Sequence, residues 1–267
     1  MTPRTLKLTI TYDGTRLVGW QRQAEGTSVQ GLLEEALARL EGSPVTVHGA
    51  GRTDAGVHAF GQVASAQLTC AHPPDVLRRA LNATLPPDVR IVDVCDAASD
   101  FHARFSARAK TYRYVLQNAA IVSPFEYRYV WHVPEPLDLE AMETVARTLV
   151  GTHDFAAFRS TGSISTTTVR TIMRSEMSTQ TGLPWIPFVD RNDVQTDGDR
   201  PRWMVYEVSG DGFLRHMVRA IVGTLVDIGR GRFPPGRMAE LLANGSRSDA
   251  GATAPAQGLF LVRVDYH

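Results

Sequence analysis

The chain has 267 residues, of which 43% are hydrophobic and 21% are charged, a composition typical of a soluble globular protein. No run of about 18 apolar residues is present and the first residues lack the apolar core of a signal peptide, so we expect a cytoplasmic protein without a membrane-spanning helix. The 28 basic and 28 acidic residues cancel, so net charge alone does not indicate a nucleic-acid-binding protein.

The first hundred residues predict elements in the order β-α-β-β-α-β. Residues 6–12 alternate apolar and polar side chains, which indicates a strand. Residues 28–42 place apolar side chains at helical spacing, with Ser28 as the expected N-cap and Gly42 as the expected end of the helix. The other elements expected in this half are strands over 45–48 and 61–68, a helix over 73–85 and a strand over 89–94.

The rest of the chain predicts a similar order of elements. These are a strand over 111–117, a helix from Asp138 to Gly151, strands over 166–177 and 203–210, helices over 212–229 and 236–245, and a strand over 258–266. The sequence therefore predicts an α+β protein made of two tandem ferredoxin-like halves, with mixed, mainly antiparallel sheet and a central cleft between the halves. We expect an N-terminal half over 1–105 and a C-terminal half over 106–267.

Two features do not follow from this plan. Residues 178–202 join two predicted strands without periodicity and are too long for a simple hairpin turn, so they form either a mobile surface loop or a functional flap.

Basic residues gather in 101–113, which contains no acidic residue, and in 212–237, where Asp227 is the single acidic residue. A neutral protein with segregated charge can still present a basic cleft.

The stretch GAGRTDAGVHAFGQ, residues 49–62, places Asp54 on a glycine-rich turn close to Arg52. Gly49, Gly51 and Gly56 permit positive φ angles and the close approach of a ligand to the backbone. An arginine near a carboxylate keeps it ionised, which suits a nucleophile better than a general acid. A surface turn with a local ion pair explains the same spacing equally well.

Other chemistries find no support in the sequence. The stretch 49–62 lacks the lysine and the spacing of a phosphate-binding P-loop. The eight histidines include no HExxH motif, and Cys70 and Cys95 form no CxxC motif, so we predict no metal site and no disulfide scaffold.

The stretch 49–62 closely resembles the signature of the TruA family of tRNA pseudouridine synthases. Further segments resemble that family in the same order along nearly the whole chain. They are YDGTRLVGWQRQ, TSVQGLLEEAL, LNATLPPDVRI, FHARFSARAKTYRY, GTHDFAAF, GFLRHMVRAIVGTL and TAPAQGLFLVRVDY.

The resemblance implies an isomerase that converts uridine to pseudouridine at positions 38, 39 and 40 of the tRNA anticodon stem-loop, with no cofactor and as a homodimer. It places Asp54 on the catalytic aspartate and Arg52 on the arginine expected at the backbone of the flipped nucleotide, both in the N-terminal half. It places Tyr112 on the tyrosine that stacks against the target uracil, and Arg219 on the arginine that pairs with the aspartate. The predicted cleft is then an RNA-binding cleft, and Asp54 attacks either the uracil ring or the sugar.

Two other functions are compatible with parts of the sequence. An RNA-binding module that has lost catalysis would keep the ferredoxin-like halves and the arginine clusters, but it would have no need of a carboxylate facing RNA. An aspartate-based hydrolase is disfavoured because the expected metal ligands are absent. Asp54, Tyr112 and Arg219 together therefore favour the isomerase.

Overall fold

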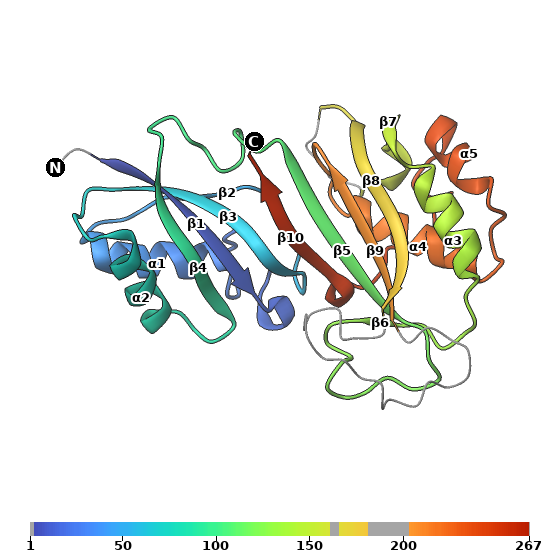
Figure 1. Ribbon diagram of the computed structural model, residues 1–267, viewed down its shortest axis with the longest axis horizontal. Coiled ribbons are helices and arrows are strands. Elements are labelled where there is room, and N and C mark those ends of the chain that lie inside the picture. The colour runs from blue at the N-terminus through green and yellow to red at the C-terminus, as the bar shows by residue number, and fades with distance from the viewer. Residues whose placement is uncertain (1–2, 161–165, 181–202, 267) are drawn as a thin grey trace. The chain divides into compact units, whose positions relative to one another are not determined.

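The computed structural model describes residues 3–160, 166–180 and 203–266. The chain divides into two compact units, one made of Met1–Lys110 with Phe260–His267 and the other of Thr111–Leu259 (Figure 1). The first unit is therefore completed by the end of the chain, whereas sequence reasoning assigned these last residues to the C-terminal half. The boundary between residues 105 and 106 stays a prediction.

The first unit contains five strands and two α-helices within its described residues. These are β1 Arg4–Tyr12, β2 Val47–Gly49, β3 His58–Leu68, β4 Val89–Ala97 and β10 Leu259–Asp265, with α1 Val29–Glu41 and α2 Pro74–Thr84. The strands lie in the order β4-β1-β3-β10, and β2 pairs with β3 as well. β1 runs antiparallel to β3 and β4, whereas β10 is parallel to β3. Up to β4, the order β-α-β-β-α-β agrees with the prediction.

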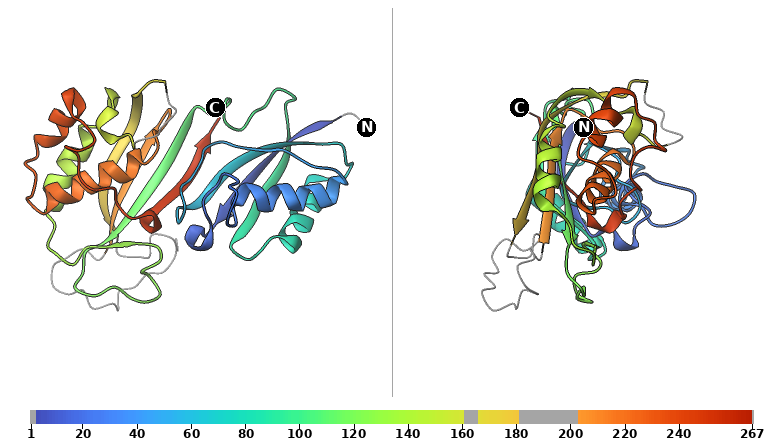
Figure 2. Two further views of the ribbon diagram at one scale, coloured as in Figure 1. Left: turned by 180° about the vertical axis from the view of Figure 1, so that it is seen from behind. Right: turned by 90° about the vertical axis from the view of Figure 1, so that its right-hand side faces the viewer.

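The alternation of side chains in β1 explains how this sheet packs. Leu6, Leu8 and Ile10 are fully buried on the face that α1 and α2 cover (Figure 2). Lys7 pairs in register with Ser65 of β3, so these two side chains lie on the opposite face. Both predicted caps of α1 are confirmed, because Ser28 Oγ accepts a hydrogen bond from Gly31 N and Gly42 has a φ of 79°.

The second unit contributes five more strands and has its own helices. Its elements are β5 Ala109–Gln117, β6 Trp131–His132, β7 Gly151–Asp154, β8 Val169–Gln180 and β9 Trp203–Gly210, with α3 Leu139–Arg147, α4 Met217–Gly229 and α5 Arg237–Asn244. The strand order is β5-β9-β8-β7, and β6 pairs in parallel with β5. β8 is antiparallel to both β7 and β9. The predicted α+β class with mixed, mainly antiparallel sheet is confirmed.

Helix α4 forms the core of the second unit. It is apolar around most of its circumference, as expected of a helix surrounded by other elements. A Cβ on Gly223 would lie 1.7 Å from the Ala252 carbonyl oxygen, so only glycine lets these two backbones approach so closely. Helix α3 packs against both α4 and β8.

Several predicted boundaries were wrong, each for a local backbone reason. The helix expected over 212–229 begins only at Met217, because His216 has a φ of 63° and leaves the helical conformation. The helix expected to end at Gly151 stops at Arg147, and Gly151 instead begins β7 with a φ of 118°. The short strands β6 and β7 were not predicted.

β8 extends to Gln180, and residues 181–202 of the predicted loop lie outside the described residues. Within the ranges that are described, none of the helices is both long and apolar enough to cross a bilayer.

Candidate functional site

The glycine-rich loop joins β2 to β3 and is fixed to the rest of the first unit by backbone hydrogen bonds. Ala50 N donates to Val63 O at 2.8 Å, at the start of the loop. Trp20 N donates to Thr53 O at 3.0 Å, immediately before Asp54. The loop backbone is therefore held at the residue that precedes the predicted catalytic carboxylate.

Asp54 itself begins a tight turn. Val57 N donates to Asp54 O at 3.2 Å, and Gly56 at the third position has a φ of 78°, as in a type II turn. Positive φ was also considered for Gly49 and Gly51, but neither has it. Gly49 is needed for another reason, because a Cβ there would lie 2.3 Å from the Trp20 indole.

A second segment with two glycines packs directly against this loop. A Cβ on Gly14 would lie 2.1 Å from Val57 O, and a Cβ on Gly19 would lie 2.5 Å from Thr53 O. Gly19 also has a φ of 105°. The segment 12–20 and the loop therefore touch through their backbones, which leaves no room for a side chain at either glycine.

Buried polar side chains hold the loop from beneath. Thr53 is buried, and its Oγ1 lies 2.8 Å from the hydroxyl of Tyr12. Gln62 is also buried, and its Nε2 donates to Gly51 O at 2.9 Å. Burial raises the pKa of Tyr12 to about 12, so the hydroxyl stays protonated. Sequence reasoning did not identify Tyr12, Thr53 or Gln62, whose only signal was their place in segments that resemble the family.

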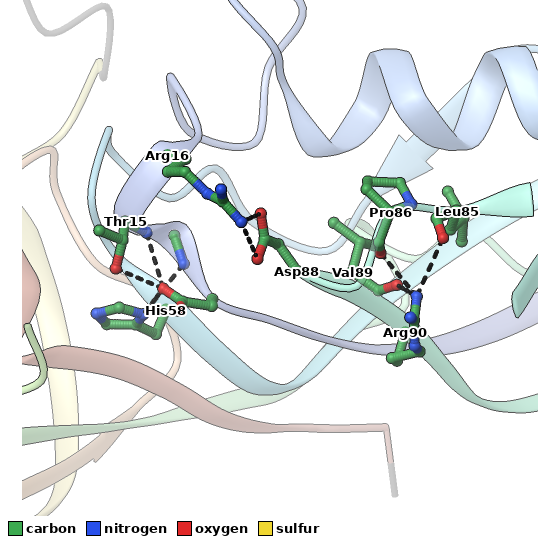
Figure 3. Close-up of polar contacts among 10 residues, drawn as sticks. Thr15, Arg16, His58, Leu85, Pro86, Asp88, Val89 and Arg90 are labelled. Carbon is green, nitrogen blue, oxygen red and sulfur yellow. Dashed lines mark hydrogen bonds and ion pairs between the residues drawn. The ribbon is translucent and has the colours of Figure 1, made fainter. Parts of the chain in front are cut away.

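The residue that follows the loop is tied to the same segment. Asp13 Oδ1 accepts from Thr15 N at 2.9 Å and lies 3.2 Å from Nδ1 of the buried His58 (Figure 3). Gly14 N donates to the same Nδ1 at 3.0 Å. The short 3-10 helix η1, Gly14–Arg16, is thereby connected to the end of the loop.

Two arginines of this region serve structural contacts. Arg16 Nη2 donates to both oxygens of Asp88, at 2.9 and 2.8 Å. Arg90 Nη1 donates to the carbonyls of Leu85, Pro86 and Val89 (Figure 3). Both arginines thus hold the turn before β4.

Arg52 does not form the local ion pair with Asp54 that an ordinary surface turn would have. Arg52 is exposed, and it makes no ion pair with any residue of the described ranges. Asp54 is partly buried on the same loop. The local Arg52–Asp54 pair of an ordinary surface turn is therefore not present, and the Arg52 guanidinium is available to an anionic ligand.

Tyr112 and Tyr114 lie on β5 in the second unit. Tyr112 is 7% exposed, and its ring packs edge-on against Phe213 with centroids 5.0 Å apart. Tyr114 is fully buried and its hydroxyl donates to Pro255 O at 2.7 Å, while burial raises its pKa. Tyr114 is therefore a core residue. Tyr112 has an ordered ring held by Phe213, a contact that sequence reasoning missed.

Arg219 lies in the first turn of α4. Its Nε donates to Ala254 O at 2.7 Å, and Ala254 N donates back to Arg219 O at 3.1 Å. This reciprocal pair orients the guanidinium relative to the helix. His216, which precedes the helix, holds a positive φ that is costly for a residue other than glycine. The strained backbone of His216 thus lies directly before the helical turn that contains Arg219.

The two arginine clusters contain residues of different kinds. Four arginines form ion pairs, Arg113 with Glu207, Arg230 with Glu135, Arg232 with Asp227 and Arg237 with Glu240. By contrast, Arg104, Arg108 and Arg215 are exposed and have no carboxylate partner in the described part of the chain. Together with Arg52, these three are candidates for contacts with a polyanion.

The two units thus each hold part of the predicted site. The first presents Asp54 and Arg52 on one rigid loop, and the second presents Tyr112 and Arg219 on β5 and α4. Across residues 3–160, 166–180 and 203–266, no group of three or more histidine, cysteine, aspartate and glutamate side chains could hold a metal ion. The first unit thus supplies a carboxylate on a fixed loop, and the second supplies an ordered aromatic ring and an oriented guanidinium.

Comparisons with known proteins identify relatives along the whole chain. A family model described as tRNA pseudouridine synthase matches residues 8–106 and 145–267. The tRNA pseudouridine synthase A of Syntrophotalea carbinolica is 44% identical over 261 residues, which cover 98% of this chain and 96% of the relative. That of Pelobacter propionicus is 45% identical over 263 residues, which cover 98% and 100%.

The solved structures that match this chain are much less similar to it than these relatives are. A chain from the crystal structure of an archaeal box H/ACA sRNP complex matches with a TM-score of 0.32 and 9% identity, over 83% of this chain and 44% of that chain. A likeness of this size carries no argument about fold or function.

Proposed function

Because the chain belongs to the tRNA pseudouridine synthase family, we propose that it acts in the cytoplasm on uridines 38, 39 and 40 of the tRNA anticodon stem-loop, with Asp54 as the nucleophile. The conversion of uridine to pseudouridine in tRNA is the reaction of the family and of this enzyme. The target positions and the roles of individual residues are the proposal.

The reaction rearranges bonds without redox chemistry. The bond between N1 of uracil and C1′ of ribose breaks, the base turns, and a bond forms between C5 and C1′, while the proton of C5 is lost and N1 gains one. A carboxylate can begin this by adding to C6 of the ring or by acting at the sugar. Both routes need a carboxylate oxygen at a fixed place, and the hydrogen bonds of the loop around Asp54 support such a placement.

The target base must leave its stack before Asp54 can reach it. Flipping a nucleotide costs a few kcal/mol, and stacking on an aromatic side chain restores about 1–3 kcal/mol per base. We assign this role to Tyr112, whose ring is already held by Phe213. Arg52 is assigned to the backbone of the flipped nucleotide. The pairing of Arg219 with Asp54 stays a prediction.

One observation supports the catalytic role of Asp54 more than any other. Gly14, Gly19 and Gly49 each allow a contact that fixes the loop, at distances where a Cβ would collide. An RNA-binding module without catalysis would gain nothing from a carboxylate held so rigidly, because a carboxylate repels phosphates. Precise placement of one charged oxygen is a requirement of catalysis.

The positions of modification can be tested directly. We expect an unmodified tRNA transcript with uridines at 38, 39 and 40 to acquire pseudouridine at these sites when incubated with the full chain. Carbodiimide treatment followed by primer extension locates each product. Pseudouridine found only outside 38–40 would contradict the proposed target and leave the family reaction in place.

We also propose that the enzyme is a homodimer, as the family resemblance implies. Light scattering at micromolar concentration without RNA should give about twice the mass of one chain. A single-chain mass would contradict the proposal.

A further inference from the structure

An exposed aromatic cluster lies on the first unit, outside the loop that carries Asp54. It consists of His48, His102, Arg104 and Phe105, which we call the Phe105 surface. The His102 ring lies 4.8 Å from the His48 ring and 4.4 Å from the Phe105 ring, measured between centroids. The Arg104 guanidinium lies 5.6 Å from the centroid of Phe105. Phe105 is nevertheless 77% exposed, so its contacts leave most of the ring open to solvent.

The turn that carries Phe105 is closed by its own hydrogen bonds. His102 N donates to Ser106 Oγ at 3.1 Å, and Ser106 N donates to His102 O at 2.9 Å. Inside the turn, Arg104 N donates to Nδ1 of His102 at 3.1 Å. The exposure of Phe105 is therefore fixed by an ordered turn and does not result from a frayed segment.

Two contacts anchor this turn to the sheet face opposite α1 and α2. Ala103 N donates to Oγ of the buried Ser65 at 3.1 Å, and the Tyr266 hydroxyl donates to Ala103 O at 2.8 Å. His48 of β2 is paired in register with Ser65 and directly precedes Gly49. The Phe105 surface therefore lies where the chain enters the loop that carries Asp54.

The charges around the Phe105 surface favour a polyanion. Arg104 and Arg108 are exposed and have no carboxylate partner among the described residues. Residues 101–113 include no acid. Burial, together with the nearby His48 and Arg104, lowers the pKa of His102, which agrees with its Nδ1 accepting hydrogen bonds from backbone N–H groups. His102 thus adds a neutral ring, while the cationic charge comes from the arginines.

We propose that the Phe105 surface binds an unpaired base of the tRNA substrate other than the target uridine, with the base stacked on Phe105 and Arg104 against the adjacent phosphate. An open aromatic ring beside an arginine is the combination that proteins use to hold single-stranded RNA. The inference deepens the proposed function, but it requires only that tRNA is the substrate, whichever uridine is modified.

The test compares tRNA binding by full-length variants. Phe105→Leu keeps an apolar side chain and removes the ring, so we expect affinity for an unmodified tRNA transcript to fall about tenfold or more. Phe105→Trp should bind within about twofold of the unchanged enzyme. The matched control is Phe125→Leu, which removes a ring that is 88% exposed elsewhere in the chain and should leave binding unchanged. Single-turnover rates at saturating tRNA should be equal in all of them.

Salt dependence separates the two contacts of the proposal. Arg104→Ala should lower the slope of log affinity against log salt by about one phosphate contact, whereas Phe105→Leu should lower affinity equally at every salt concentration. Because Phe105 is exposed, neither variant should lower the melting temperature. If Phe105→Leu does lower it, Phe105→Gln repeats the binding test with a side chain suited to solvent.

Two results would overturn the inference. One is binding by Phe105→Leu within twofold of the unchanged enzyme. The other is a loss of mass by light scattering in the absence of RNA, which would identify the Phe105 surface as a contact between copies of the chain. Both readouts are independent of where pseudouridine forms, so failure at positions 38–40 and failure of the Phe105 surface are distinguishable.

Discussion

Asp54→Asn should reduce pseudouridine formation by at least about a thousandfold while tRNA binding remains. The amide has the shape of the carboxylate but lacks its charge and its nucleophilic oxygen, so addition to the ring or action at the sugar cannot begin. Binding survives because removing one negative charge does not weaken contacts to phosphates. The measurement is single-turnover product formation on an anticodon stem-loop at saturating enzyme, with affinity determined separately.

Two further variants sharpen this result. Asp54→Glu should also fail, because the longer side chain misplaces the oxygen by about 1 Å and reactions of this kind depend on position. Asp88→Asn is the matched control, since it converts another carboxylate of the first unit to an amide and removes only the pair with Arg16. It should keep full activity. Product formation by Asp54→Asn within tenfold of the unchanged enzyme would refute the role of Asp54.

Gly19→Ala should lower the single-turnover rate about a hundredfold. The new Cβ would lie 2.5 Å from Thr53 O and 3.0 Å from the carbonyl carbon of Asp54, so the loop backbone has to shift by about 1 Å. A displacement of that size lowers the rate about a hundredfold, because the reaction depends on the exact position of the carboxylate. tRNA affinity should fall much less than the rate, because the exposed Arg104, Arg108 and Arg215 lie outside the loop that shifts. Single-turnover and binding assays on the same preparation separate the two effects.

Gly42→Ala is the control for the backbone part of this change. Gly42 also has a positive φ, of 79°, but a Cβ there meets nothing within 4 Å. The substitution should cost about 1–2 kcal/mol of stability and leave the rate unchanged. If Gly19→Ala and Gly42→Ala have rates within threefold of each other, the contact between Gly19 and the loop is not important for catalysis.

The elements that sequence reasoning predicted best are those governed by local rules. The caps of α1 at Ser28 and Gly42 depend on residues within the same helix, and both were found as expected. The start of α4 was placed too early because the apolar periodicity of 212–229 continues through His216, whose positive φ ends the helix on that side. Periodicity carries no information about one residue in an unusual conformation.

The parts of the site that could not be predicted depend on contacts between distant residues. Tyr12 meets Thr53 across 41 positions of sequence, and Arg219 is oriented by the carbonyl of Ala254. The arginine clusters show the same limit, since Arg113 and Arg230 looked like RNA contacts until their partners Glu207 and Glu135 were located. A family resemblance identified Asp54, Arg52, Tyr112 and Arg219 but not what holds them, and their roles stay predictions.

The last strand has a consequence for how the protein is made on the ribosome. β10 pairs with β3 at Phe260 and Leu261, and the Phe260 ring stacks on His58 and Phe60 at 4.8 and 5.0 Å. His58 directly follows the loop that carries Asp54, yet it emerges from the ribosome about two hundred residues before Phe260. Contacts so distant in sequence form late in folding. Most of the first unit is therefore synthesised well before Phe260, and a nascent chain cannot assemble a complete support for its loop until Phe260 has been synthesised.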